Sequence, residues 1–381
     1  MIYADFNGSA PMHPKVREYL TTRINSGPYA NPNAIHSLGK KMGMGLEKAR
    51  MSIAKNLGAK PNQIIFNSGS SEGITHVYRS VLDNTDKKVI ISSGIEHSAV
   101  AQGNDFYKDR GFTLITVKTD QDGTVDIDNF KAAVKIHKNH IALVSIMAAN
   151  NETGVIQPNE EIAQICQENE LLYFSDTTQF IGKTDFNFEE SKMDFAVLSG
   201  HKIGAIIGSG VLLVKNPHLL KPLVFGGGQE CGLRGGTQNY IGAETLAIAL
   251  ESFKEEKSRL KEISKIRIDF ESKLKEKFPK IVVIGDDAKR LPCGSLISYP
   301  GIHGQAVQIE LEAEDIFVTT SSACSDNEPE TSKVLRAMNI DDAIGRGVIR
   351  ISFCTKVSQD NYDKVYSALC SIYSKLEKIS I

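Results

Sequence analysis

Short apolar runs rich in β-branched residues alternate with helical patterns through more than half of this chain. The runs lie at residues 63–66, 89–91, 113–117, 141–147, 171–175, 195–198 and 210–214. Most of them are apolar throughout, which is typical of strands that are covered on both faces. Strands that alternate with helices form a parallel sheet with helices on both sides. The sequence therefore predicts an α/β domain built on a mostly parallel sheet.

Polar residues follow the strands of this predicted sheet. The residues that stand at or just after a strand end are Ser70, His97, Asn151, Asp176 and Lys202. In open α/β sheets, ligands bind outside the carboxyl ends of the strands. Because these ends meet at one edge of the sheet, we expect the polar side chains to surround one ligand.

The C-terminal part of the chain has a different pattern. One long, charged helical pattern covers residues 243–278 and would span roughly 50 Å at about 1.5 Å per residue. The short strand patterns after it lie at 295–298, 316–318 and 348–352, mixed with helical patterns. We therefore expect a large domain at 14–255 and a smaller α+β domain formed by 1–13 and 256–381.

Composition and charge argue against several classes of function. The 381 residues carry a formal net charge of −2, with 24% charged and 41% hydrophobic residues. This balance creates no field that would attract nucleic acid or an anionic membrane, and the N-terminus does not resemble a signal peptide. The 6 cysteines form no C-x-x-C pair, so free thiols are expected, and no metal site is predicted. We expect a cytoplasmic protein that contacts neither nucleic acid nor membrane.

Lys202 ends the segment Ser199-Gly-His-Lys202, which follows one apolar run and precedes another. A lysine in this place is often a surface residue at the end of a strand. Lysine is also the residue that forms a Schiff base with pyridoxal phosphate, because its amine becomes nucleophilic when burial or a neighbouring cation lowers its pKa. The lysine alone does not decide between these interpretations, so the other parts of a cofactor site must be sought elsewhere.

Candidates for the other parts of a pyridoxal phosphate site stand at the strand ends. Asp176 could keep the ring nitrogen protonated, and His97 could stack on the ring. The further candidates are donors to the ring hydroxyl (Gln179 and Asn151), a phosphate cradle (Ser70, Ser71, Ser199, His201 and Thr237) and a guanidinium for the substrate carboxylate (Arg350). Two of these serines begin a helical pattern whose first amides would point at an anion, although the same pattern also suits an ordinary helix cap.

Short motifs stand in a particular order along the chain. They are Ser68-Gly-Ser-Ser-Glu72, Ile95-Glu-His97, Asn150-Asn-Glu-Thr-Gly154, Asp176-Thr-Thr-Gln179, Ser199-Gly-His-Lys202, Arg234-Gly-Gly-Thr237 and Ser322-Ala-Cys324. This ordered set resembles the cysteine desulfurases of the class V branch of fold-type I pyridoxal phosphate enzymes. The resemblance implies a large domain with a mostly parallel seven-stranded sheet and a smaller α+β C-terminal domain that carries the catalytic cysteine loop.

The resemblance also implies a reaction and the residues that perform it. L-Cysteine would be converted to L-alanine, with Lys202 and His97 moving protons and the thiolate of Cys324 taking the sulfur as a persulfide. The persulfide would then pass to a sulfur-acceptor protein. The residues expected to bind the substrate are Arg350, Asn151 and Asn33. Thr237 is expected to reach the phosphate of a neighbouring subunit, so the resemblance implies a homodimer.

Four segments depart from the family's pattern and leave the substrate and the rate open. These segments are 5–10, 33–34, 203–208 and 229–231. An aminotransferase or a selenocysteine lyase of the same class is therefore an alternative, and a non-catalytic scaffold with this fold is another. The sequence decides neither between cysteine and selenocysteine nor among iron–sulfur cluster assembly, tRNA thiolation and DNA phosphorothioation as the pathway that receives the sulfur.

Overall fold

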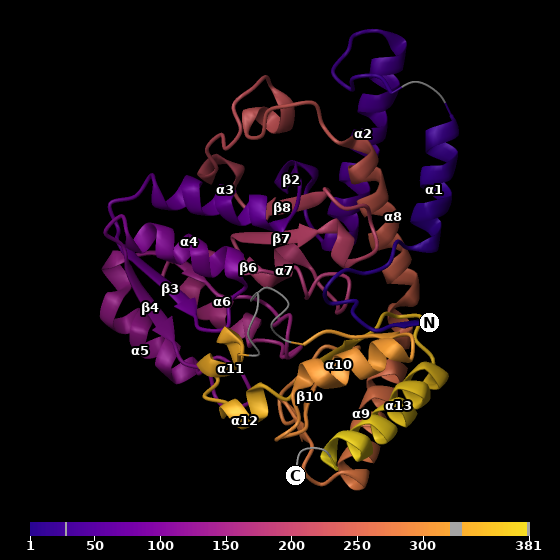
Figure 1. Cartoon of the computed structure of the whole chain (residues 1–381). Helices are drawn as coiled ribbons and strands as arrows, with labels where there is room; N and C mark the ends of the chain where they lie inside the picture. Colours follow the sequence, from indigo (N-terminus) through magenta and orange to yellow (C-terminus); the bar gives the residue numbers. More distant parts are fainter. Residues whose placement is uncertain (27–28, 321–329, 379–381) are drawn as a thin grey trace.

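The computed structural model describes residues 1–26, 29–320 and 330–378, and its main feature is a seven-stranded sheet (Figure 1). The strands in sheet order are β2 (Ile64–Asn67), β8 (Gly210–Val214), β7 (Phe195–Ser199), β6 (Tyr173–Asp176), β5 (Ile141–Ser145), β3 (Val89–Ser93) and β4 (Thr113–Val117). Strand β8 runs antiparallel to β2 and β7, and the other neighbouring pairs are parallel. The predicted mostly parallel seven-stranded sheet is therefore confirmed.

Helices cover this sheet on both faces because successive strand residues point to opposite sides. In β2, Ile64 and Phe66 belong to one hydrophobic core, whereas Ile65 between them belongs to another. The first core includes residues of α2 (Ser37–Leu57), α5 (Ile127–His137), α6 (Asn159–Glu168), α7 (Phe188–Ser191) and α8 (Tyr240–Glu256), and the second includes residues of α3 (Ser70–Leu82) and α4 (Ser98–Lys108). Helix α1 (Pro14–Asn25) packs against α8. None of the helices in the described ranges is long and apolar enough to span a bilayer.

The antiparallel strand β8 brings the end of β2 next to the end of β7. Asn67, the last residue of β2, and Ser199, the last residue of β7, both pair with Gly210 at the start of β8. Strand β6 ends at the same edge with Asp176, whose partner in β7 is Val197. The start of α3 and the ends of β6 and β7 therefore lie together at one edge of the sheet.

The C-terminal part forms a separate core around a three-stranded antiparallel sheet in the order β12-β10-β9. Its elements are β9 (Val282–Val283), β10 (Gly294–Ser298), β12 (Val348–Ser352), α9 (Leu260–Lys277), α10 (Gly304–Ala313), α11 (Lys333–Ala337), α12 (Asp342–Gly345) and α13 (Gln359–Glu377). The N-terminal strand β1 (Ile2–Tyr3) pairs with β11 (Ile316–Phe317), so the chain start joins this part. We propose that 1–13 and 256–381 form the smaller domain and 14–255 the larger one.

The prediction of one long helix over 243–278 is wrong. A 3₁₀ turn at Lys257–Arg259 separates α8 from α9, and both helices can be followed in Figure 1. The two helices bury their apolar sides in different cores. Arg259 holds the turn in place by donating hydrogen bonds to the carbonyls of Thr355 at 2.8 Å and Val357 at 3.1 Å.

Glu271 of α9 is expected to contribute strongly to stability because it pairs with two buried arginines. It accepts hydrogen bonds from Arg267 at 2.9 Å and from Arg290 at 2.8 Å. Glu271→Ala would leave both positive charges buried, so the free energy of unfolding should fall by about 3–5 kcal/mol in urea denaturation. Glu262→Ala is the control, because Glu262 on the same helix forms an exposed pair with Arg259 that contributes less than about 1 kcal/mol. Equal losses for the two variants would contradict this role of Glu271.

Candidate active site

Hydroxyl groups and a helix start form a polar cluster at the edge of the sheet. The backbone N–H of Ser70 donates to Ser199 Oγ at 2.8 Å, and Ser70 Oγ lies 2.6 Å from Thr178 Oγ1. Gly69 permits this close approach, because its φ is 152° and a Cβ would lie 3.2 Å from Ser199 Oγ. The amides of the first turn of α3 and these hydroxyls can bind an anion such as a phosphate. Ser71, predicted for the same cradle, is exposed next to them.

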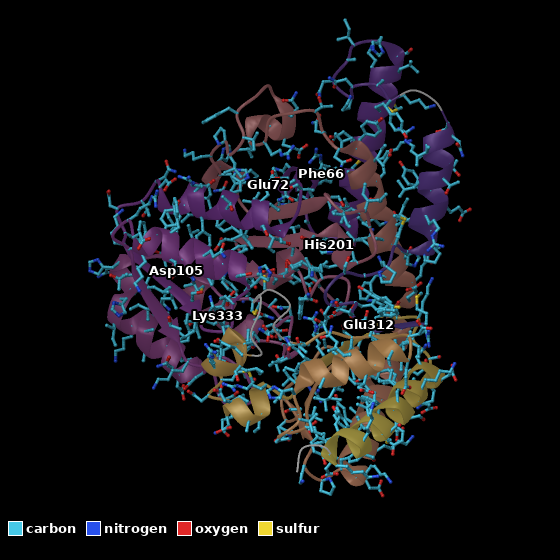
Figure 2. The ribbon with its side chains drawn as sticks, viewed as in Figure 1. Phe66, Glu72, Asp105, His201, Glu312 and Lys333 are labelled. Atoms are coloured by element: carbon cyan, nitrogen blue, oxygen red, sulfur yellow. The ribbon has the colours of Figure 1, made fainter. Side chains whose placement is uncertain are left out.

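Lys202 lies in the 3₁₀ turn that directly follows β7. Its Nζ donates to the backbone carbonyls of Asn7 at 2.9 Å and Gly8 at 2.6 Å. The same turn places His201 Nδ1 3.1 Å from Ser9 Oγ, and Figure 2 shows His201 near the middle of the molecule. Burial, followed by the charges of two neighbouring lysines, lowers the pKa of His201. The N-terminal segment therefore packs directly on the lysine and the histidine.

Asp176 is the buried acid at the end of β6. Its Oδ1 accepts the backbone N–H of Thr178 at 3.0 Å, which fixes the carboxylate. A second buried acid, Glu96, accepts from Ser93 Oγ at 2.5 Å and from the backbone N–H of Met147 at 2.9 Å. Burial, with a smaller contribution from Asp176, raises the pKa of Glu96 to about 8. Glu96 is therefore protonated at neutral pH and adds no charge that would compete with Asp176 for a protonated ring.

Arg350 of β12 connects the C-terminal part to the edge of the large sheet. Its Nη2 donates to Asp5 Oδ1 at 2.7 Å, and its Nη1 donates to the carbonyl of Asn151 at 3.0 Å. Its Nε is buried and has no hydrogen-bond partner among the residues that the structure describes. Arg350 can therefore bind a further acceptor, and a carboxylate is the ligand that fits the planar guanidinium best.

His97 and Asn151 border this cluster in different ways. His97 caps α4, with its Nδ1 accepting the backbone N–H of Ala99 at 3.1 Å. The residue is exposed, so its ring can stack on a bound ring. Asn151 joins the cluster through its backbone, because its carbonyl accepts from Arg350 and from Asn7 Nδ2, the latter at 3.4 Å.

Asn7 and Lys183 are further members of the cluster that the sequence motifs did not indicate. Asn7 Oδ1 accepts a hydrogen bond from Lys183 Nζ at 2.6 Å, and the Asn7 carbonyl accepts one from Gln179 Nε2 at 2.9 Å as well as the bond from Lys202. Lys183 Nζ also donates to Gln179 Oε1. Burial, followed by the charge of Lys202, lowers the pKa of Lys183 to about 7. A second amine that titrates near neutrality therefore lies beside the predicted reactive lysine.

The sequence marks the further site residues Asn7, Thr178 and Lys183 to different degrees. Asn7 lies in the departing segment 5–10, so the departure itself pointed to an altered site. Thr178 stands inside the Asp176–Gln179 motif, and its position after a strand end could have identified it. Lys183 follows a glycine in what reads as an ordinary surface turn, and no local pattern marks it as buried.

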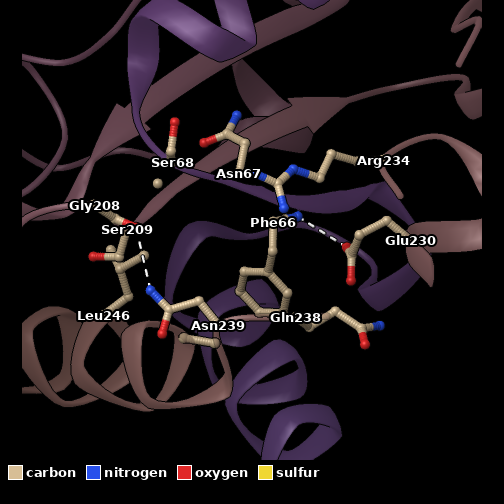
Figure 3. Close-up of a pocket in the computed structure, with 12 residues that line it drawn as sticks. Phe66, Asn67, Ser68, Gly208, Ser209, Glu230, Arg234, Gln238, Asn239 and Leu246 are labelled. Carbon is tan, nitrogen blue, oxygen red and sulfur yellow. Dashed lines mark hydrogen bonds between the residues drawn. The ribbon is translucent and has the colours of Figure 1, made fainter. Parts of the chain in front are cut away.

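Two residues that the sequence predicts for the site, Asn33 and Thr237, form no hydrogen bond to this cluster within the described part of the chain. Both are exposed, and Asn33 Nδ2 donates to Gln238 Oε1 at 2.8 Å. Thr237 and Gln238 line an open hollow of about 340 Å³ together with residues 29–31. Figure 3 shows a second pocket, to which Gln238 also contributes. Cys324 lies outside the residues that the structure describes.

Comparisons with known proteins find relatives along the whole chain. The profile of the Aminotransferase class-V family matches residues 2–365. A curated cysteine desulfurase of Nostoc sp. (strain PCC 7120) is 33% identical over 382 residues, and the cysteine desulfurase NifS of Azotobacter vinelandii is 30% identical over 384 residues; each alignment covers 100% of this chain and 94% of the relative. A solved NifS-like protein has a TM-score of 0.90 and 33% identity, with 98% of this chain and 99% of that chain covered. A structure of SspA in complex with cysteine has a TM-score of 0.81 and 27% identity, with 93% and 99% covered.

Proposed function

The chain belongs to the class-V aminotransferase family, and on this basis we propose that it is a pyridoxal phosphate-dependent cysteine desulfurase. The full-length relatives confirm the resemblance that the sequence motifs indicate. The similar structure in complex with cysteine supports L-cysteine as the substrate. The observation that carries the proposal is that hydrogen bonds through Asn7 and Asn151 bring the Lys202 amine and the Arg350 guanidinium into one site. An α-amino acid substrate needs both groups, an amine that carries the cofactor and a cation for its carboxylate.

The residues at the sheet edge fit pyridoxal phosphate. The hydroxyls of Ser70, Ser199 and Thr178 bond to one another at the start of α3, so they can turn together toward a phosphate group. Asp176 supplies a buried carboxylate for the ring nitrogen, and Lys202 supplies the amine for the aldehyde. The other residues that we assign to the cofactor are His97, Asn151, Gln179, Ser71, His201 and, across the subunit interface, Thr237.

Lys202 and His97 are the groups that we assign to proton movement. When bound, pyridoxal phosphate supplies a protonated ring that draws electrons from the amino acid and so weakens its bonds. The carbonyls of Asn7 and Gly8 hold Lys202 Nζ in place, and a fixed amine can take up a proton and return it. His97 lies at the exposed end of the site, where its ring can both stack and exchange protons with solvent.

Arg350 is the residue that we assign to the substrate carboxylate. Lys202 Nζ donates to the Asn7 carbonyl, and Asn7 Nδ2 donates to the Asn151 carbonyl, which also accepts from Arg350 Nη1. Asn7 and Asn151 therefore link the Lys202 amine to the Arg350 guanidinium through hydrogen bonds. An α-amino acid bound between them would give its carboxylate to the buried Nε of Arg350. The additional residues that we assign to the substrate are Asn151 and Asn33.

Cys324 is the residue that we assign to the sulfur atom. Its thiolate attacks the substrate sulfur, the carbon–sulfur bond breaks, and the carbon skeleton leaves as alanine while the sulfur stays on Cys324 as a persulfide. The Ser322-Ala-Cys324 motif supports this assignment. A thiol of a sulfur-acceptor protein would then take the terminal sulfur by the same kind of attack.

Product analysis tests this function directly. Purified protein is incubated with pyridoxal phosphate, L-cysteine and a thiol reductant, and alanine and sulfide are measured together. We expect the two products in equal amounts. A keto acid in place of alanine would indicate an aminotransferase, and turnover of selenocysteine without turnover of cysteine would indicate a selenocysteine lyase. A protein that makes no product and binds no cofactor would be a scaffold.

We also propose a homodimer, because the segments around Thr237 expose large apolar side chains. These residues are Tyr29, which lines the same hollow as Thr237, and Ile35, Ile207, Val224 and Phe225, which stand on segments joined to residues 234–239. Hydrogen bonds from Asn33 to Gln238 and from Asn239 to the carbonyl of Gly208 connect the segments that carry Ile35 and Ile207. Exposed apolar surface of this kind commonly marks a protein interface. Thr237, the residue expected to reach a neighbouring subunit, stands in the same region.

Phe225→Asp should weaken the dimer. Phe225 is 89% exposed, and its burial in an interface would contribute about 1.5–3 kcal/mol, so we expect at least a roughly tenfold increase in the dimer dissociation constant. Sedimentation velocity over a concentration series measures this change. Ile136→Asp on α5 is the matched control, because Ile136 is 73% exposed but lies outside the region. A monomeric wild-type protein, or a dimer that only Ile136→Asp dissociates, would contradict this interface.

A further inference from the structure

An acidic residue, Glu72, lies in the first turn of α3, beside the serines that we assign to the phosphate group. Its Oε2 accepts hydrogen bonds from the backbone N–H of Ser68 at 3.0 Å and from Ser68 Oγ at 2.6 Å. Burial acts to raise the pKa of Glu72, but hydrogen bonds from Arg234 and Ser68 outweigh it, so the pKa of this carboxyl lies below its usual value. Glu72 is therefore ionised at neutral pH.

An ionised Glu72 competes with a phosphate group for the same end of α3. The free amides and the dipole of a helix start stabilise negative charge, and the carboxylate already uses part of this stabilisation. A phosphate monoester carries between one and two negative charges at neutral pH, so it is also repelled by the carboxylate. A phosphate at Ser70 and Ser71 therefore binds more tightly when the charge of Glu72 is neutralised.

Arg234 of the glycine-rich loop supplies the neutralising charge. Its Nε donates to Glu72 Oε1 at 2.8 Å, and its Nη2 donates to Glu72 Oε2 at 3.3 Å. The side chains of Arg234 and Glu72 are 26% and 16% exposed, so solvent screens this pair less than it screens a pair on the open surface. The two-pronged contact joins the glycine-rich loop to the start of α3.

A second ion pair leaves Arg234 available to Glu72. Glu230 is the other acid that acts on Arg234, but its carboxylate accepts from Arg50 Nη2 at 2.8 Å and from Arg50 Nη1 at 2.9 Å. This anchor also fixes the loop, because Glu230 and Cys231 have φ values of 48° and 57°, a conformation that residues other than glycine rarely adopt. Figure 3 shows Arg234 and Glu230 beside the same pocket.

We propose that Arg234 is a positioning residue for the phosphate group of the cofactor, because it neutralises Glu72 and leaves the start of α3 free to bind a doubly charged anion. This inference rests on the proposed function, since it assumes that pyridoxal phosphate binds there. Thr237, three residues later on the same loop, is assigned to the phosphate of the neighbouring subunit. One loop would therefore serve both phosphate sites of the dimer.

A comparison of pyridoxal phosphate with pyridoxal, which lacks the phosphate, tests the proposal without any turnover. Cofactor-free protein is titrated with each compound and reduced with borohydride, and the labelled fraction of the Lys202 peptide is measured by mass spectrometry. Arg234→Met should weaken the binding of pyridoxal phosphate about tenfold and leave the binding of pyridoxal unchanged. Arg234→Lys keeps the positive charge and should stay within about threefold of the wild type.

Glu72→Gln separates the charge of the ion pair from its role in holding the loop. Glutamine keeps an oxygen that accepts from Ser68 but has no charge, so the double variant Arg234→Met/Glu72→Gln should regain wild-type affinity for pyridoxal phosphate. Glu72→Gln alone should bind pyridoxal phosphate at least as tightly as the wild type, and this result does not depend on the folding of Arg234→Met.

Arg79→Met is the matched control. Arg79 stands at the other end of α3, where it pairs with Asp83 at 3.2 Å, so its loss should change the binding of neither compound. Thermal melting confirms that each variant is folded.

The outcomes separate this inference from the proposed function. A wild-type protein in which neither compound labels Lys202 would overturn the function and the inference together. Labelling of Lys202 with the same affinity for pyridoxal phosphate in wild type and Arg234→Met would overturn the inference alone. The inference would also fail if Arg234→Met weakened both compounds equally, or if Glu72→Gln weakened pyridoxal phosphate or did not restore the double variant, because Arg234 would then act on the folding of the loop.

Discussion

Lys202→Ala is expected to abolish both the covalent attachment of pyridoxal phosphate and the turnover of L-cysteine. The amine of Lys202 is the group held at the sheet edge by the carbonyls of Asn7 and Gly8, and alanine offers nothing that could bond to an aldehyde. Removal of the attacking group from an enzyme costs many orders of magnitude, so we expect a loss of at least about 10⁴-fold in turnover. Borohydride reduction followed by peptide mapping measures attachment, and alanine release measures turnover.

Lys202→Arg is the matched variant for this experiment. Arginine keeps the positive charge and can still donate to the carbonyls of Asn7 and Gly8, but its guanidinium stays protonated and does not attack an aldehyde. We expect Lys202→Arg to be folded and as inactive as Lys202→Ala. Cofactor fixed by borohydride to Lys183 with retained turnover in either variant would transfer the catalytic amine to Lys183 and contradict the assignment of Lys202.

The large sheet could be predicted because its signals are local. Strands β5 and β7 are buried on both faces, and such strands appear in the sequence as continuous apolar runs. The break between α8 and α9 was missed because a charged amphipathic pattern looks the same for one helix or for two. The turn depends on hydrogen bonds from Arg259 to residues about one hundred positions later, and no local pattern reports such a contact.

The site could be predicted only where its residues stand at strand ends. Lys202 and Asp176 follow apolar runs directly, so their meeting at one edge follows from the parallel arrangement of the strands. Asn7 and Lys183 meet across 176 residues of sequence, and only because the N-terminal segment packs over the sheet edge. Lys183 becomes a titrating group through burial and through Lys202, and both causes arise only after the chain has folded.

Cys324 is the thiol that we expect to receive the sulfur, and the described cysteines are poorer candidates. Burial raises the pKa of Cys293 to about 12 and also raises that of Cys166 and Cys354, so these groups are protonated at neutral pH and react weakly with sulfur. Cys231 is exposed in the glycine-rich loop and is the most accessible competitor. A comparison of Cys324 with Cys231 therefore decides which thiol carries the persulfide.

Cys324→Ser should keep pyridoxal phosphate on Lys202 but reduce sulfide and alanine formation by at least about 1000-fold, since a hydroxyl is far less acidic and less nucleophilic toward sulfur than a thiol. Wild-type protein and variant are incubated with L-cysteine, and persulfide is mapped by mass spectrometry after alkylation. We expect the persulfide on Cys324 in the wild type, no persulfide in Cys324→Ser, and normal labelling of Cys324 in the control Cys231→Ser.

Persulfide on Cys231 would preserve the enzyme class but move the acceptor. Transamination products without any persulfide would instead show that the shared cofactor site serves an aminotransferase, because only a desulfurase needs a thiol to accept the substrate sulfur.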